Sequence, residues 1–159
     1  SKFETNLIIT LTSTTVGNIL QIFLDGEDIT NLSVTERAKR GISFAFQQPV
    51  RFKGITVKDL ISIAKGKEIS VSEACGYLSE VGLCAKDYIN REVNASLSGG
   101  ELKRIEIATV MARGTSLSIF DEPEAGIDLW SYFFVRKLRN VRNVRIKIAH
   151  FAICAHIFQ

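Results

Sequence analysis

The chain has 159 residues, of which 46% are hydrophobic and 23% are charged, and its formal net charge is +3. This length and composition are typical of one folded globular domain and exclude a disordered chain. The charge is too small to indicate a nucleic-acid partner, and no apolar run approaches the roughly 18 residues that span a bilayer. We therefore expect a cytoplasmic protein without direct membrane insertion.

The first forty residues carry signals for strands, a turn and a helix. Apolar runs flank a Ser/Thr cluster in residues 7–24, which predicts two strands separated by an irregular segment, and the Asp-Gly pair at 25–26 predicts a turn. Ser33 followed by Glu36 is the pattern of a capping box, so a helix is predicted over residues 34–40.

A helical segment is predicted to interrupt the strands that follow. Residues 42–46, ISFAF, are β-branched and aromatic, as a buried strand would be. From about residue 49 to residue 100 the sequence has caps and apolar residues at helical spacing. The caps are Thr56 with Asp59 and Ser70 with Glu73. We therefore expect one domain over residues 1–159, with a helical subdomain at about 49–100 and the motif loops at one edge of a mainly parallel sheet.

The stretch SLSGGELKRIEIATVMAR begins the next predicted helix. Glu101 follows Ser98 by three residues, which by itself indicates only a capping box. Between them stand Gly99 and Gly100, whose lack of side chains lets backbone N–H groups approach an anion closely. The helix dipole favours negative charge at the same place, so we predict a phosphate site.

Two adjacent carboxylates follow the apolar run LSIF, which predicts a buried strand. Ligands bind at the carboxyl ends of strands in open α/β sheets, and Asp121 and Glu122 stand at such an end. The first carboxylate is suited to holding Mg²⁺ through water and the second to polarising an attacking water. Gln47, after the preceding strand, is a neutral oxygen donor for the same Mg²⁺ shell. The alternative is a solvated pair of turn acids.

Three motifs resemble those of ATP-binding cassette (ABC) ATPases, both in their residues and in their order along the chain. LSGGE resembles the signature motif, LSIFDEPEAGID the Walker B strand with the D-loop, and FAFQQP the Q-loop. More narrowly, REVNASLSGGELKRIEI and SFAFQQPV are similar to the SufC-type ATPases of iron–sulfur cluster assembly. The resemblance covers about residues 25–131. It implies an α/β fold, with a P-loop NTPase-like core and an inserted α-helical subdomain, which we expect to be incomplete at both ends.

The resemblance implies ATP and Mg²⁺ as cofactors and a role for each motif. It implies that Gln47 senses Mg²⁺ and the attacking water, that Asp121 binds Mg²⁺, and that Glu122 acts as general base. Asp128 is then the D-loop aspartate that touches the other subunit. The signature residues implied to bind the γ-phosphate of ATP held by a partner subunit are Ser98, Gly99 and Gly100.

Partners are implied by the same resemblance. A signature loop that completes another subunit's site requires a nucleotide-dependent dimer with a second ABC subunit. The similarity to SufC-type ATPases further implies SufB/SufD-like scaffold proteins as partners. Two alternatives stay open: the ATPase subunit of an ABC transporter, and a non-catalytic truncated relic or interaction module.

The chain departs from the family pattern at the phosphate-binding loop. No G-x-x-x-x-G-K-[ST] segment occurs in the 159 residues, and Thr12 stands where the lysine of such a loop is expected. Ser13 or Thr14 then takes the position of the Mg²⁺-binding hydroxyl. This departure leaves open whether the chain by itself binds or hydrolyses ATP, and it predicts weak nucleotide binding by the isolated chain.

The C-terminal end offers a histidine and a basic run. RIKIAH is a strand-like run that ends in His150, which resembles the switch histidine of the family, and His156 competes for this role. These two residues and Cys154 are also conceivable zinc ligands. Residues 136–147 carry six Lys or Arg, which predicts a solvated helix face or a surface that attracts phosphate or lipid headgroups.

Overall fold

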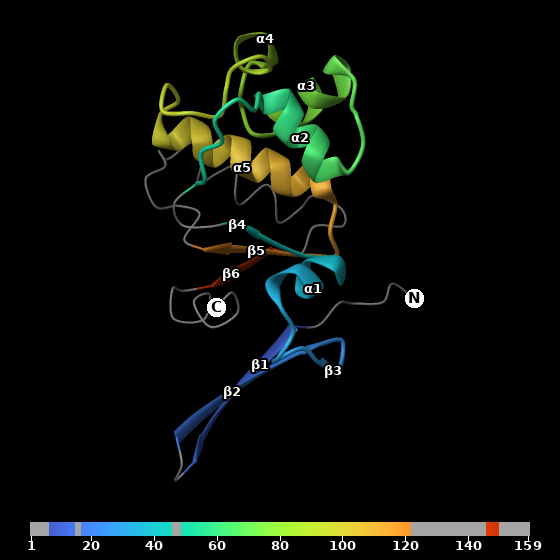
Figure 1. The fold of residues 1–159 in the computed structure, drawn as a ribbon, viewed down its shortest axis with the longest axis vertical. Coiled ribbons are helices and arrows are strands. Elements are labelled where there is room, and N and C mark those ends of the chain that lie inside the picture. The colour runs from blue at the N-terminus through green and yellow to red at the C-terminus, as the bar shows by residue number, and fades with distance from the viewer. Residues whose placement is uncertain (1–6, 15–16, 46–48, 122–145, 150–159) are drawn as a thin grey trace.

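The computed structural model of the chain describes residues 7–14, 17–45, 49–121 and 146–149. The strands are β1 (Leu7–Thr14), β2 (Gly17–Leu24), β3 (Glu27–Asp28), β4 (Ile42–Ala45), β5 (Leu117–Asp121) and β6 (Ile146–Ala149). The helices are α1 (Val34–Lys39), α2 (Val57–Lys65), α3 (Val71–Glu80), α4 (Ala85–Tyr88) and α5 (Gly99–Arg113). Figure 1 shows the layers they form: helices α2–α5, then the β4–β5–β6 sheet, then the hairpin of β1 and β2.

The first three strands form an antiparallel sheet. β1 and β2 pair along their whole length, from Leu7 opposite Leu24 to Thr14 opposite Gly17. The irregular segment predicted between two strands in residues 7–24 is therefore wrong, because the Ser/Thr-rich stretch continues β1 as a paired strand. The turn predicted at residues 25–26 is confirmed: both residues have positive φ, 52° and 85°, as a two-residue hairpin turn requires.

The remaining strands form a parallel sheet in the order β4-β5-β6. All three were predicted as strands from their apolar runs. The expected mainly parallel sheet is correct for these strands but wrong for the first three, which pair separately. β1 and β2 are joined by two residues, and a connection that short permits only antiparallel pairing.

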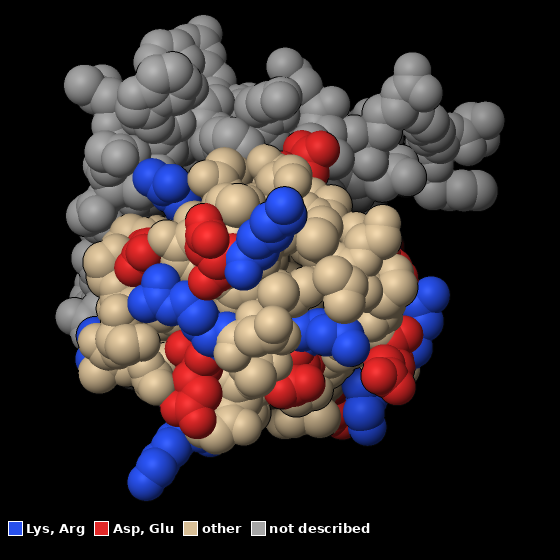
Figure 2. Space-filling model, turned by 90° about the horizontal axis from the view of Figure 1, so that it is seen from above, with Lys and Arg blue, Asp and Glu red and all other residues tan. Residues whose placement is uncertain are grey.

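The predicted helices begin at the predicted caps. Ser33 and Glu36 close a capping box at the start of α1, and Thr56 and Asp59 close one at the start of α2. The side chain of Ser70 caps α3. Helices α2–α4 fall inside the predicted helical subdomain and lie together on the side of α5 that faces away from the parallel sheet (Figure 1). Basic and acidic side chains are interspersed over their outer face (Figure 2).

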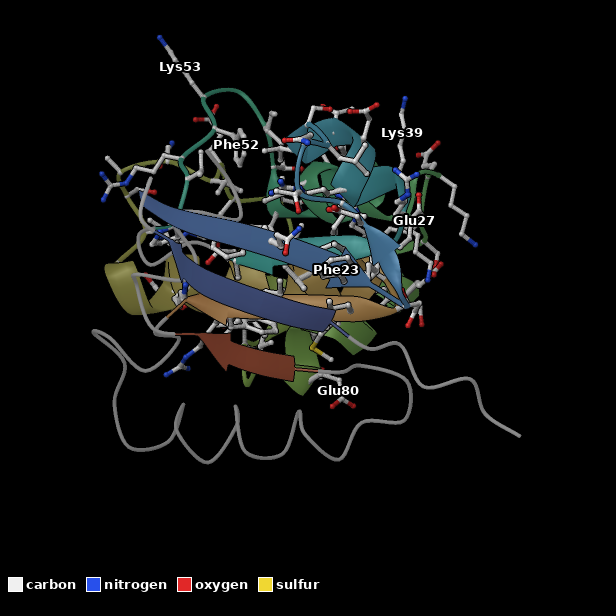
Figure 3. All side chains as sticks on the ribbon, turned by 90° about the horizontal axis from the view of Figure 1, so that it is seen from below. Phe23, Glu27, Lys39, Phe52, Lys53 and Glu80 are labelled. Atoms are coloured by element: carbon white, nitrogen blue, oxygen red, sulfur yellow. The ribbon has the colours of Figure 1, made fainter. Side chains whose placement is uncertain are left out.

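Two buried clusters join these layers through the alternation of side chains along β5. Phe120 packs into the cluster shared with the helices, where Ile61, Leu78 and Ile105 are fully buried. Leu117 and Ile119 point to the other face and pack with residues of β2, β4 and the segment directly after β3: Ile22, Leu24, Ile42 and Ile29. The hairpin thus covers the second face of the sheet, as the view from below shows (Figure 3).

Candidate functional site

The start of α5 is built by a complete capping box. The Ser98 side chain accepts a hydrogen bond from the Glu101 N–H at 3.2 Å, and the Glu101 carboxylate accepts one from the Ser98 N–H at 2.6 Å. Leu97 and Leu102, on either side of the box, are both buried in the helical cluster. This pair corresponds to a hydrophobic staple, which sets the angle at which the chain enters the helix. The predicted cap is confirmed, and its two hydrogen bonds lie between two buried leucines.

Gly99 and Gly100 form the first two helical positions and face open space. Among the residues that the structure describes, neither backbone N–H has an acceptor. A Cβ placed on either glycine would meet nothing within 4 Å. The two N–H groups therefore stand free at the positive end of a 15-residue helix, with room for an anion to approach. This geometry fits a phosphate oxygen. The packing of the surrounding residues does not require glycine at either position.

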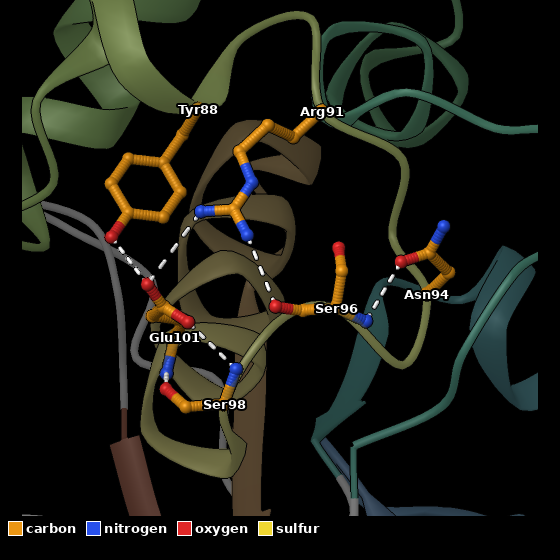
Figure 4. Close-up of polar contacts among 6 residues, drawn as sticks. All are labelled: Tyr88, Arg91, Asn94, Ser96, Ser98 and Glu101. Atoms are coloured by element: carbon orange, nitrogen blue, oxygen red, sulfur yellow. Dashed lines mark hydrogen bonds and ion pairs between the residues drawn. The ribbon is translucent and has the colours of Figure 1, made fainter.

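Two residues that precede α5 in the sequence, Tyr88 and Arg91, hold this helix start (Figure 4). The Tyr88 hydroxyl donates a hydrogen bond to Glu101 Oε1 at 2.5 Å, and Arg91 Nη1 lies 3.8 Å from the same oxygen. Arg91 Nη2 also donates to the carbonyl oxygen of Ser96 at 3.1 Å, and the guanidinium lies 5.2 Å from the Tyr88 ring centroid. The loop before the helix is thus tied to both Arg91 and Glu101.

These contacts fix the protonation of the two acidic groups. The hydrogen bond from Tyr88, together with that from the Ser98 backbone, lowers the pKa of Glu101 below its ordinary value. The same bond raises the pKa of Tyr88, so its hydroxyl stays protonated and remains the donor. Sequence reasoning assigned no role to Tyr88 or Arg91. Two signals in the sequence could have pointed to Arg91. The capping carboxylate of Glu101 needs a counter-charge, and an arginine lies ten residues before it.

Asp121 ends β5 at the same edge of the parallel sheet where β4 ends. The register pairs Ala45 with Phe120 and Asp121 with Ala149. Because the carboxyl ends of parallel strands meet at one edge, the end of β4 at Ala45 and the end of β5 at Asp121 share this edge. Helix α5 runs opposite to β5, so its N-terminus points toward this edge as well (Figure 1).

Several predicted residues fall elsewhere or are not described. Ser13 and Thr14 lie in β1, opposite Asn18 and Gly17, on the far side of the parallel sheet from α5 (Figure 1). A phosphate loop places its hydroxyl at the start of a helix, so this strand geometry lends no support to their role, which stays a prediction. Five further candidates lie outside the described residues: Gln47, Glu122, Asp128, His150 and the competing His156. For Asp121 the structure describes the backbone.

Two further properties concern the described part of the chain. It contains no group of three or more His, Cys, Asp or Glu side chains placed to hold a metal ion together. The conceivable zinc ligands His150, Cys154 and His156 are not among the residues searched. No helix within the described ranges is long and apolar enough to cross a membrane.

Comparisons with known proteins agree on one family. The ABC transporter family profile matches residues 5–125. The chain is 38% identical over 124 residues to an uncharacterized ABC transporter ATP-binding protein of Methanocaldococcus jannaschii, covering 74% of this chain and 50% of the relative. It is 33% identical to a probable ATP-dependent transporter of Pyropia yezoensis and 31% identical to one of Synechocystis. These alignments cover 82% of this chain and 58% and 57% of those relatives.

A solved structure supports the fold. A bacterial Atm1-family ABC exporter with ATP bound superposes with a TM-score of 0.66 at 22% identity, over 82% of this chain and 24% of the exporter chain. The chain spans about half the length of the curated relatives it matches. The motif order, the fold and the family match lead to one conclusion: the chain belongs to the ABC transporter family of ATP-binding proteins.

Proposed function

We propose that this chain is a cytoplasmic ATP-binding subunit of an ABC-type complex whose α5 helix start contacts the γ-phosphate of ATP held by a second ABC subunit. The observation that carries the proposal is the pair of free N–H groups on Gly99 and Gly100, next to the Ser98 cap. Backbone N–H groups at a helix start bind phosphate without needing a charged side chain. A nucleotide-dependent dimer follows, because each such helix start completes a site on the partner.

The carboxyl edge of the parallel sheet supplies the other half of the proposed chemistry. Asp121 and Gln47 offer oxygen donors of the kind Mg²⁺ prefers, and the ion when bound would offset phosphate charge. Glu122 is placed by sequence directly after the metal-binding carboxylate, where it accepts a proton from the attacking water. Asp128 is proposed to contact the other subunit, and His150 to face the γ-phosphate.

For the wider system we favour a SufC-like subunit that drives iron–sulfur cluster assembly with SufB/SufD-like scaffold proteins. The similarity of REVNASLSGGELKRIEI to SufC-type ATPases supports it. The second candidate is the ATPase subunit of an ABC transporter, which the names of the relatives favour. Affinity purification from the native cell separates them: two soluble scaffold proteins support the first candidate, and a membrane subunit supports the second.

We also propose that residues 1–159 form one domain with its helical subdomain at about 49–100.

The test of hydrolysis is Glu122→Gln, which keeps the size of the side chain and removes its charge. With the second ABC subunit and Mg²⁺·ATP present, we expect phosphate release to cease and the ATP-bound complex to last longer. The longer lifetime follows because repulsion between the carboxylate and the γ-phosphate is gone. Asp121→Asn is the comparison and should instead weaken Mg²⁺ binding, so that a higher Mg²⁺ concentration is needed. Unchanged phosphate release by Glu122→Gln would contradict the proposal and favour the non-catalytic interaction module.

A further inference from the structure

The start of α5 contains an electrostatic conflict that the proposed function has to resolve. Glu101 closes the capping box, and its carboxylate lies 2.6 Å from the Ser98 nitrogen, one residue before the free N–H groups. A phosphate bound to Gly99 and Gly100 would lie within about one Debye length, roughly 8 Å, of that negative charge. The residue that shapes the site therefore also repels the ligand proposed for it.

Arg91 is placed to remove this conflict. One arm of its guanidinium lies 3.8 Å from the Glu101 carboxylate, and the other donates to the Ser96 carbonyl at 3.1 Å. The Ser96 N–H in turn donates to Asn94 Oδ1 at 2.9 Å, so the loop is fixed from both sides (Figure 4). A planar guanidinium can make two such contacts at once, whereas a lysine ammonium offers a single point charge.

We propose that Arg91 is a positioning residue of the γ-phosphate site, which braces the loop before α5 and offsets the charge of Glu101 so that the Gly99 and Gly100 N–H groups can receive a phosphate. This inference rests on the proposed function. It adds to the proposed phosphate site a residue, Arg91, that does not itself touch the nucleotide. Tyr88 assists by holding the same carboxylate oxygen and by lying under the guanidinium.

A double-mutant cycle between Arg91 and Glu101 tests the charge argument. The full chain is mixed with an ABC ATP-binding subunit of the same genome that carries a phosphate loop, in millimolar Mg²⁺·ATP, and association is measured by sedimentation. We expect Arg91→Gln to weaken association about tenfold, as for the loss of one charge-assisted contact. Adding Glu101→Gln should restore it to within about threefold of the parent, because the repulsive charge is then gone.

Further measurements separate this role from a purely structural one. The defect of Arg91→Gln should shrink in about 0.5 M salt, where charge repulsion is screened. Its unfolding temperature without nucleotide should stay within about 2 °C of the parent, because the ion pair is partly exposed. Arg91→Lys should fall between parent and Arg91→Gln. Lys86→Gln, which removes an exposed cation of α4, is the matched control and should associate like the parent.

Each contrary result has a distinct meaning. Normal association of Arg91→Gln, or no rescue by Glu101→Gln, overturns the role of Arg91 and leaves the proposed function standing. A salt-independent defect with a lowered unfolding temperature overturns it as well, since Arg91 would then serve only the fold. Failure of the parent chain itself to associate in ATP overturns the proposed function and this inference together.

Discussion

Replacing Gly99 and Gly100 with alanine should stabilise the chain while damaging its proposed contact with ATP. Both residues have ordinary helical backbone angles, and neither is among the glycines with positive φ. A Cβ at either position meets nothing within 4 Å. Alanine at such a site stabilises by about 0.4–1 kcal/mol, because the unfolded chain loses conformational freedom. The double variant should gain about 1–2 kcal/mol, or roughly 2–8 °C in unfolding temperature for a chain of this size.

The same two methyl groups should interfere with a phosphate. A phosphate oxygen has to come within about 2.9 Å of an N–H nitrogen to form a hydrogen bond, and each Cβ stands beside that approach. Charge-assisted bonds are worth about 1.5–3 kcal/mol each, so losing one weakens association at least about tenfold. Stability is measured by urea unfolding, and association by sedimentation with the phosphate-loop subunit in Mg²⁺·ATP.

Gly76→Ala is the matched control for this prediction. Gly76 lies inside α3, and a Cβ there also meets nothing within 4 Å. It should stabilise by a similar amount and leave ATP-dependent association unchanged. The reasoning is refuted if the Gly99/Gly100 double variant is less stable than the parent, since the fold would then need these glycines. It is equally refuted if the double variant associates normally.

Two further predictions concern stability. Ile105→Ala, at a fully buried position of α5, should cost about 2–5 kcal/mol in urea unfolding, whereas Ile63→Ala, at a position 65% exposed, should cost less than about 0.5 kcal/mol; equal costs would contradict the core described above. The second concerns pH. Side-chain hydrogen bonds from Ser33, Thr56 and Tyr88 lower the pKa values of the carboxyl groups of Glu36, Asp59 and Glu101 below their ordinary values of 4.5, 3.8 and 4.5. A lowered folded-state pKa contributes stability that is present above the ordinary value and is lost as pH falls toward the folded value. The free energy of unfolding should therefore decrease from pH 6 to pH 3, and Glu101→Gln should flatten that decrease; a pH-independent free energy over this range would contradict the sign.

The sequence alone was sufficient for features that depend on neighbours within a few residues. The capping boxes at Ser33, Thr56 and Ser98 each join a side chain to a backbone group three residues away, and all three form as predicted. The turn at residues 25–26 and the apolar strands were predictable for the same reason, since propensity and spacing act locally. The order of the three motifs identified the family, which the comparisons confirm.

Only the tertiary structure decided what meets across long separations in the chain. β4 pairs with β5 although more than 70 residues lie between them, and residues 7–24 form a hairpin that covers the far face of that sheet. Tyr88 and Arg91 reach Glu101 only because the segment that carries them folds back against the start of α5. Such contacts depend on where whole elements pack, and packing is determined by burial summed over the layers. A short stretch of sequence does not determine that packing. The contacts of Tyr88 and Arg91 with Glu101 could therefore be recognised only in the folded chain.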